Sequence, residues 1–269
     1  WSVTSAGAIT QSAALTVSGT SSFTSTGTNT NITLNTDTNA FTGSVTLTTA
    51  GTSGDVSIDN NTTALGIQGT INGGLTVRNG AAITDSSTLT VSGTSSFTID
   101  TGSNHITLGS AALTGAIGVS TTGTSNFTLD NTTTAVNLGT VGVTGALSVT
   151  SGEAITDSGV ITVTTTSSFT TDVNNKAINL GSSNAMSGNI TVSTLGTTGN
   201  VTIDNGTTAL GIQGTVNGAL NLTAGAAITD SSTLTVSGTS DFTIDNGSNH
   251  ITLGSAVLTG AIGVSTTGT

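Results

Sequence analysis

Cysteine, proline and tyrosine are absent from the 269-residue sequence, and Arg78 and Lys176 are its only basic residues apart from two histidines. Without cysteine there can be neither a disulfide framework nor a thiolate metal site. Binding to nucleic acid depends on lysine and arginine that neutralise phosphates, so we expect no nucleic-acid partner. No run of about eighteen apolar residues occurs, so we expect no membrane insertion.

Threonine, serine, asparagine and glycine dominate the chain, with valine, isoleucine and leucine at short, regular intervals between them. Branching at Cβ gives threonine, valine and isoleucine a strong preference for strands. The net charge of −11 is modest for this length, so the polar composition does not indicate disorder. The sequence therefore predicts an ordered, all-β protein.

One sequence unit recurs at nearly constant intervals along the chain. The isoleucines of the motif AIT and the phenylalanines of the motif SFT or DFT both show it, since the numbering rises by 74, 72 and 73 from copy to copy: Ile9, Ile83, Ile155 and Ile228, and Phe23, Phe97, Phe169 and Phe242. We place the repeat units at residues 1–74, 75–146, 147–219 and 220–269. The last is incomplete, and we expect the chain to be a fragment of a longer array. Alternate units are the closest relatives, since residues 81–124 and 226–269 differ at only three positions.

Each repeat offers eight short strand candidates, which in the second begin at Ile83, Leu89, Phe97, Ile106, Ile117, Phe127, Val136 and Leu147. Two architectures fit these candidates. The first is a string of small β-sandwiches, which predicts linkers between the repeats and antiparallel hairpins. The second is a single continuous parallel β-solenoid with about 18 residues and two strands per turn, so that four turns make one repeat. No linker composition separates the repeats, and the absence of proline suits a chain whose backbone N–H groups nearly all join a ladder. We therefore predict the solenoid.

The motifs AITDSSTLTVSGTSSFTID (residues 82–100) and LTGAIGVSTTGT (residues 113–124) belong to a pattern that extends over the whole chain. This pattern resembles the repeats of giant secreted bacterial surface proteins, the filamentous-haemagglutinin-like exoproteins and related large adhesins. The resemblance implies a right-handed parallel β-helix, secretion, and a role at the cell surface as a stalk, fibre or adhesin. It implies no particular ligand.

We expect no enzymatic activity. The chain has one glutamate, Glu153, and its two cations lie at different positions of the repeat. Its two histidines, His105 and His250, are copies of one repeat position, as expected of duplicated surface residues. No serine lies in a nucleophile-elbow motif, and no glycine-rich stretch carries the lysine of a phosphate-binding loop.

Two sets of aspartates recur with the repeat as candidate ligands, and a third set, Asp100, Asp172 and Asp245, follows the phenylalanine strand. Asp85, Asp157 and Asp230 belong to the motif AITDS, and Asp59, Asp130 and Asp204 begin the motifs DNNTT, DNTTT and DNGTT. Calcium is the one cofactor that these six could bind, because it prefers oxygen ligands. The alternative is that they form turns by bonding nearby backbone, as aspartate often does. No calcium-binding motif is present, so turn formation is the preferred interpretation.

The predicted function is a structural, extracellular repeat segment, that is, the shaft of a fibre, stalk or adhesin. One alternative is a self-assembling filament, because uncapped strand edges allow copies to associate end to end or with further repeats of the same chain. A second alternative is a solenoid face that contacts glycan, a cell surface or ice. Thr-x-Thr triplets such as residues 46–48, 88–90 and 233–235 suit an ice-binding face, but they are intermittent in the sequence.

Overall fold

The fold consists of short strands because apolar and polar residues alternate along the chain. The computed structural model describes residues 1–267 and contains no helix among them; accordingly, none of these residues belongs to a helix that could span a membrane. Along β7 (Val45–Ala50), Val45 and Leu47 are buried, whereas Thr46 and Thr48 are half-exposed. This alternation gives each strand one apolar side, which packs into an interior.

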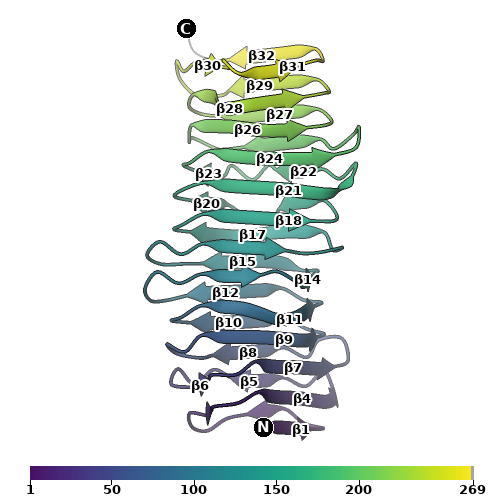
Figure 1. The fold of residues 1–269 in the computed structure, drawn as a ribbon, viewed down its shortest axis with the longest axis vertical. Coiled ribbons are helices and arrows are strands. Elements are labelled where there is room, and N and C mark those ends of the chain that lie inside the picture. The colour runs from purple at the N-terminus through teal and green to yellow at the C-terminus, as the bar shows by residue number, and fades with distance from the viewer. Residues whose placement is uncertain (268–269) are drawn as a thin grey trace. The chain divides into compact units, whose positions relative to one another are not determined.

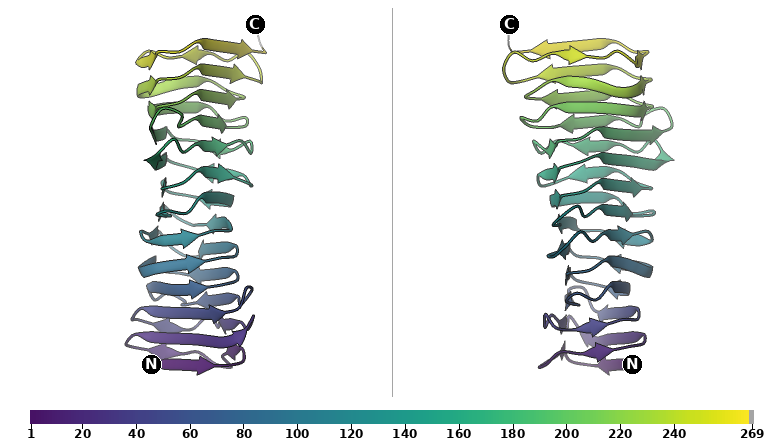
Figure 2. Two further views of the ribbon diagram at one scale, coloured as in Figure 1. Left: turned by 90° about the vertical axis from the view of Figure 1, so that its right-hand side faces the viewer. Right: turned by 60° about the vertical axis from the view of Figure 1, so that its left-hand side comes forward.

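The chain divides into two compact units, the first from Trp1 to Thr132 and the second beginning at Thr133. Within each unit the chain winds as a parallel β-solenoid (Figure 1): it alternates between two sheets, and each turn pairs in parallel with the turn before it. Both views in Figure 2 show the strands of each unit lying across the direction in which the turns stack. The predicted solenoid is therefore confirmed as the fold of both units.

Unit 1 has two main sheets and a short third one. The first sheet contains, in spatial order, β1 (Ser2–Ser5), β4 (Ser21–Thr28), β7, β9 (Leu65–Ile71), β11 (Ile83–Val91), β13 (Ile106–Leu108) and β16 (Phe127–Asp130), with β14 (Ala111–Leu113) beside β11. The second sheet contains β2 (Ile9–Thr10), β5 (Ile32–Leu34), β8 (Val56–Asp59), β10 (Leu75–Asn79), β12 (Ser95–Ile99) and β15 (Ala116–Ser120). The third sheet pairs β3 (Thr16–Val17) with β6 (Ala40–Phe41).

Unit 2 repeats this plan. Its first sheet contains β18 (Leu147–Ser151), β21 (Ser167–Asn174), β24 (Ile190–Leu195), β26 (Leu210–Val216), β28 (Ile228–Val236) and β30 (Ile251–Thr252), with β31 (Ala256–Leu258) beside β28. Its second sheet contains β17 (Val136–Val143), β19 (Ile155–Asp157), β22 (Ile178–Leu180), β25 (Val201–Asp204), β27 (Leu220–Ala224), β29 (Ser240–Ile244) and β32 (Ile262–Thr266), with β20 (Ile161–Val163) beside β17 and β23 (Ala185–Met186) beside β20. The last two residues of the fourth repeat, 268 and 269, lie outside the described residues.

A turn of the solenoid contains about 21 residues, which is longer than the expected length. Individual turns differ in length: the turn that pairs Leu65 with Ile83 is short, whereas the turn that pairs Ile32 with Val56 is long. The expectation of four turns per repeat was wrong because two of the eight strand candidates, at Ile83 and at residues 89–91, belong to the single strand β11. Seven main strands in two sheets make about three and a half turns.

Successive repeats therefore place the same motif on opposite sheets. In unit 1, Ile9 lies in the second sheet and Ile83 in the first. In unit 2, Ile155 lies in the second sheet and Ile228 in the first. At about 21 residues per turn, a pair of repeats amounts to a whole number of turns, which accounts for the closer similarity of alternate repeats in the sequence.

Inward-facing side chains form the core of each unit. All six phenylalanines have at most 1% of their surface exposed. Two residues before four of them stands a serine that is also buried, but whose Oγ has no hydrogen-bond partner among residues 1–267: Ser21, Ser95, Ser167 and Ser240. A buried hydroxyl without a partner loses its hydrogen bonds to water on folding and gains nothing in return.

We predict that Ser95→Ala stabilises unit 1 by about 1 kcal/mol, because it removes an unsatisfied buried hydroxyl at almost constant volume. The measurement is the midpoint of urea unfolding followed by circular dichroism. Ser96→Ala is the matched control, since Ser96 is an exposed neighbour on the same strand. A loss of stability in Ser95→Ala would mean that its hydroxyl has a partner, such as an internal water.

Candidate functional site

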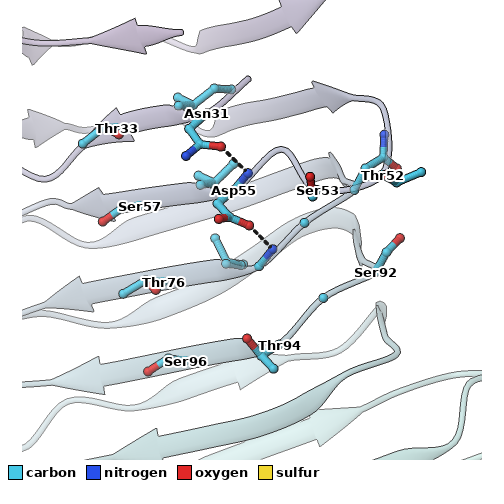
Figure 3. Close-up of a pocket in the computed structure, with 17 residues that line it drawn as sticks. Asn31, Thr33, Thr52, Ser53, Asp55, Ser57, Thr76, Ser92, Thr94 and Ser96 are labelled. Atoms are coloured by element: carbon cyan, nitrogen blue, oxygen red, sulfur yellow. Dashed lines mark hydrogen bonds between the residues drawn. The ribbon is translucent and has the colours of Figure 1, made fainter. Parts of the chain in front are cut away.

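A polar groove of about 550 Å³ follows one corner of unit 1, at the start of β5, β8, β10 and β12. Figure 3 shows that four of its hydroxyl side chains, Thr33, Ser57, Thr76 and Ser96, come from successive stacked strands. The strand register aligns them, pairing Thr33 with Ser57, Ser57 with Thr76, and Thr76 with Ser96. The groove thus presents one hydroxyl per turn, as an alternating strand pattern requires.

Side chains along the groove connect each turn to the next. The backbone N–H of Asp55 donates to Asn31 Oδ1 at 2.9 Å, and the backbone N–H of Gly74 donates to Asp55 Oδ1 at 2.7 Å (Figure 3). Asn31 and Asp55 therefore satisfy backbone donors at the corner, where the strand ladder begins. The polar groups nearest the backbone already serve the fold, which leaves hydroxyls that line the groove, including those of the four strands, as groups available to contact a ligand.

A smaller pocket of about 200 Å³ holds the arginine of unit 1 between two aspartates. Arg78 Nη1 lies 3.1 Å from Asp59 Oδ2, and Arg78 Nη2 lies 2.8 Å from Asp100 Oδ2. The side chain of Asp59 is only 4% exposed, whereas that of Arg78 is 54% exposed. The arginine therefore offsets the charge of a buried carboxylate while remaining in contact with solvent.

We predict that Arg78→Thr loosens this corner. Threonine is the residue at the corresponding position of the later copy, Thr223, where the aspartates recur as Asp204 and Asp245. Arg78 is partly exposed, so solvent screens its ion pairs. We therefore expect the free energy of unfolding to fall by only about 1 kcal/mol when Asp59 and Asp100 face each other without a cation. Hydrogen exchange of the Asn60 amide, which donates to the Arg78 carbonyl, should then become about fivefold faster.

The reciprocal variant, Thr223→Arg, is the control for this prediction. It adds a cation between Asp204 and Asp245 in unit 2 and should slow the exchange of the Asn205 amide, which donates to the Thr223 carbonyl. Both effects should shrink in high salt, since exposed ion pairs are screened. Unchanged exchange in both variants would contradict a stabilising role of the bridge.

The first set of predicted aspartates connects successive turns. Each carboxylate accepts hydrogen bonds from two consecutive backbone N–H groups about one turn further along the chain. Asp85 accepts from Gly109 and Ser110 at 2.9 and 2.6 Å, Asp157 from Gly181 and Ser182 at 2.9 and 3.2 Å, and Asp230 from Gly254 and Ser255 at 2.9 and 2.5 Å. The three residues lie in different turns, and within unit 2 Asp157 and Asp230 belong to opposite sheets.

The second set of predicted aspartates forms tight turns. Asp59, Asp130 and Asp204 each accept the backbone N–H of the residue two positions on, at 2.8, 2.9 and 2.8 Å. That residue has a positive φ in every copy: Asn61, Thr132 and Gly206. Aspartate commonly stabilises such turns by bonding the backbone two residues ahead.

Asparagines next to these aspartates have a larger role, which the sequence reasoning missed. The side-chain amide of Asn60 accepts the N–H of Phe41 at 2.7 Å and donates to the carbonyl of Phe41 at 3.0 Å. Asn131 bonds Leu113 in the same way, and Asn205 bonds Met186. All three asparagines are fully buried. Their amides replace a missing strand, because they pair with the last residue of a short outer strand as a backbone amide would.

A third surface feature is a hydroxyl ladder on the outer face of the first sheet of each unit. In unit 1 it contains Thr4, Thr24, Thr48, Thr70 and Thr90, and in unit 2 it contains Thr150, Thr170, Ser193, Thr215 and Thr235, paired in register on five successive turns. Among the described residues these ten hydroxyls make no hydrogen bond with protein groups. The row beside this ladder in unit 1 runs from Ser22 through Thr46 to Gln68, so the Thr-x-Thr triplets are intermittent in the structure too, and only the single row of hydroxyls is continuous. Because the turn length varies, equal spacing in the sequence does not reveal the ladder.

The remaining titratable groups form no cluster. His105 Nδ1 accepts the backbone N–H of Asn126 at 3.1 Å, and Lys176 lies 2.6 Å from Glu153. Within residues 1–267 no group of three or more histidine, aspartate or glutamate side chains is placed to hold a metal ion.

The model of one repeat family matches the chain four times, over residues 1–48, 53–122, 124–193 and 198–266. The chain belongs to DUF5649, a family described as repeats of unknown function. Three of the four DUF5649 matches are about 70 residues long, in agreement with the repeat length derived from the sequence, and the first, over residues 1–48, is shorter. No curated protein and no solved structure matches the chain. The DUF5649 repeat is thus a unit of parallel β-solenoid in this chain.

Proposed function

We propose that this chain is a structural shaft segment of a large extracellular bacterial surface protein, a fibre, stalk or adhesin. The observation that carries the proposal is that polar side chains repeated along the chain form hydrogen bonds with its own backbone. The six candidate aspartates, and the asparagines that follow Asp59, Asp130 and Asp204, bond backbone groups of the same or the neighbouring turn, so that these copied polar residues form turns and hold them together. A module whose repeated residues serve its own stacking is suited to span distance, and each added turn lengthens it by about 4.8 Å.

The proposal assigns neither catalysis nor a cofactor to the chain. The two histidines are copies of one position, and His105 accepts a backbone N–H. The six candidate calcium ligands direct carboxylate oxygens to backbone donors instead of to a common point. We therefore expect that added calcium leaves the thermal unfolding midpoint unchanged.

The shaft role is tested by small-angle X-ray scattering of the 269-residue chain and of a tandem duplicate of it. A shaft keeps its cross-section on duplication while its longest dimension grows in proportion to the number of turns. Flexibly joined globules would instead give a maximum dimension that depends on conformation and a broad distribution of distances. Labelling of intact, unpermeabilised cells of the source organism with antibodies against the chain tests the surface location.

A second candidate function is a filament subunit, and end-to-end association of the isolated chain would support it. In β32, Ile262 is 56% exposed and Val264 is 64% exposed, and Trp1 beside β1 is 56% exposed. Unpaired edges with apolar side chains and little charge can be extended by another copy. Light scattering of the isolated chain at rising concentration should reveal end-to-end association, and Val264→Lys should reduce it. Val173→Lys, at an exposed side position, is the control. A monomer at all concentrations would contradict the filament.

The hydroxyl ladders favour a third candidate, contact of the first-sheet face with ice or glycan. Their side chains carry no charge and repeat at the strand spacing of about 4.8 Å. An assay of ice-crystal shaping tests for binding to ice, and a glycan array tests for binding to glycan. Thr70→Lys with Thr215→Lys should abolish binding, whereas Ser120→Lys with Asn221→Lys, at exposed positions of the second sheets, should not. No binding in either assay would leave the shaft as the function.

A further inference from the structure

The sequence contains five Asn-Gly pairs, and the structure distinguishes one of them chemically. They begin at Asn72, Asn79, Asn205, Asn217 and Asn246. In an Asn-Gly pair the glycine backbone nitrogen can attack Cγ of the asparagine side chain, because glycine has no side chain to hinder the approach. The reaction requires a free amide side chain and a glycine N–H that is not held by an acceptor.

Four of the five pairs are held at both reacting groups. The side-chain amides of Asn72 and Asn217 donate to the carbonyls of Thr49 and Thr194 at 2.8 and 2.6 Å. Those of Asn79 and Asn205 are fully buried, and each donates to three backbone carbonyls. The nitrogens of the following glycines, Gly73, Gly80, Gly206 and Gly218, also donate hydrogen bonds, at 3.1, 2.5, 2.8 and 3.1 Å.

The fifth pair is free at both groups. Asn246 and Gly247 are exposed in the corner between β29 and β30, and Gly247 has a φ of 68°. Neither the Asn246 side-chain amide nor the Gly247 N–H makes a hydrogen bond within residues 1–267. Asn246 takes part in a hydrogen bond only through its backbone carbonyl, which accepts from Asn249 Nδ2 at 3.1 Å; this leaves both reacting groups free among the described residues.

We infer that Asn246 is a site of spontaneous deamidation in the folded protein. The Gly247 nitrogen loses its proton and bonds to Asn246 Cγ, the bond from Cγ to the side-chain nitrogen breaks, and ammonia leaves. Water then opens the resulting succinimide at either carbonyl and produces aspartate or isoaspartate. The product carries one additional negative charge next to Asp245, and isoaspartate also inserts a methylene group into the backbone of the corner.

The earlier copy of this corner provides matched variants. The equivalent pair there is Thr101-Gly102, in which Gly102 has a φ of 69° and the Thr101 carbonyl accepts from Asn104 Nδ2, as in the later corner. Threonine cannot form the succinimide. Asn246→Thr therefore removes the reactive group while introducing the residue that already occupies this corner, and Thr101→Asn creates a second reactive pair.

The experiment is incubation of the folded chain at 37 °C and mildly alkaline pH, followed by peptide mass spectrometry with separation of aspartate and isoaspartate. Asn246 should react at least about tenfold faster than any other Asn-Gly pair, since those must first open two or more hydrogen bonds. In urea all five should react at similar rates. Thr101→Asn should react like Asn246, and Asn246→Thr should not react at that position. Equal rates at the five pairs in the folded chain, or an inert Asn246, would overturn the inference.

Discussion

Asn60→Ala should lower the free energy of unfolding by about 3 kcal/mol, one of the two largest effects that we expect from a single substitution. Asn60 is fully buried, and its amide is the partner of both the N–H and the carbonyl of Phe41. Truncation leaves two buried backbone groups without partners, each at a cost of about 1–3 kcal/mol. The measurement is urea unfolding followed by circular dichroism, together with hydrogen exchange of the Phe41 amide.

Asn79→Ala is the control for Asn60→Ala, because the chain already has alanine at the equivalent buried position, Ala224. The carbonyls of Thr63 and Ala82, to which Asn79 donates, also accept from Asn60 and from the Leu65 N–H. The Oδ1 atom of Asn79 has no hydrogen-bond partner in the part of the chain that the structure describes. We therefore expect a loss of at most about 1 kcal/mol. Equal losses in the two variants would show that Asn60 acts by filling space and not by capping a strand.

Gly93→Ala should lower the free energy of unfolding by about 3 kcal/mol, as much as Asn60→Ala, because the corner beside the groove has no room for a methyl group. A Cβ atom at Gly93 would lie 2.6 Å from the carbonyl carbon and oxygen of Gly73 in the previous turn. These are backbone atoms that can move only if the turns separate. Urea unfolding is again the measurement, and exchange of the Gly93 N–H, which donates to the Gly73 carbonyl, should become faster.

Gly74 lines the same groove, and Gly74→Ala is the control for Gly93→Ala. The nearest atom to a Cβ there is the Thr94 carbonyl oxygen at 3.3 Å, and the equivalent residue of the later copy is already Ala219. The expected change is within about 0.5 kcal/mol. A large loss in Gly74→Ala, or none in Gly93→Ala, would contradict close backbone contact as the reason for glycine at this corner.

Much of the fold follows from the sequence because alternation of small apolar and polar residues suits only strands. The anchors at Phe97, Ile106, Ile117 and Phe127 lie in β12, β13, β15 and β16, as predicted. The turn length did not follow, because the segment from Ile83 to Val91 has two apolar anchors separated by a polar stretch. This pattern predicts two separate strands. In the structure the segment is one strand whose middle shifts register against β9.

The candidate site was harder to predict from the sequence than the fold. The recurrence of the aspartates is evident in the sequence, but the role of the asparagine that follows Asp59, Asp130 and Asp204 was overlooked, although that asparagine recurs as constantly as the aspartate before it. Its partner, for example Phe41 for Asn60, lies 19 residues away in the previous turn. Contacts of this kind depend on the turn length, so a small error in that length hides all of them. The register of the ladders Thr4–Thr90 and Thr150–Thr235 was missed for the same reason.

The offset of half a turn per repeat has a genetic consequence. Recombination between repeated DNA sequences can delete or insert one repeat at a time. Loss of a single repeat would rotate all later residues by half a turn and exchange the two faces, so that a surface selected on one side would continue on the other. Loss or gain of two repeats preserves the faces. Selection on a one-sided surface would therefore retain alleles that differ by even numbers of repeats, and allele lengths across strains would cluster in steps of two repeats, the interval that separates Ala81 from its copy Ala226.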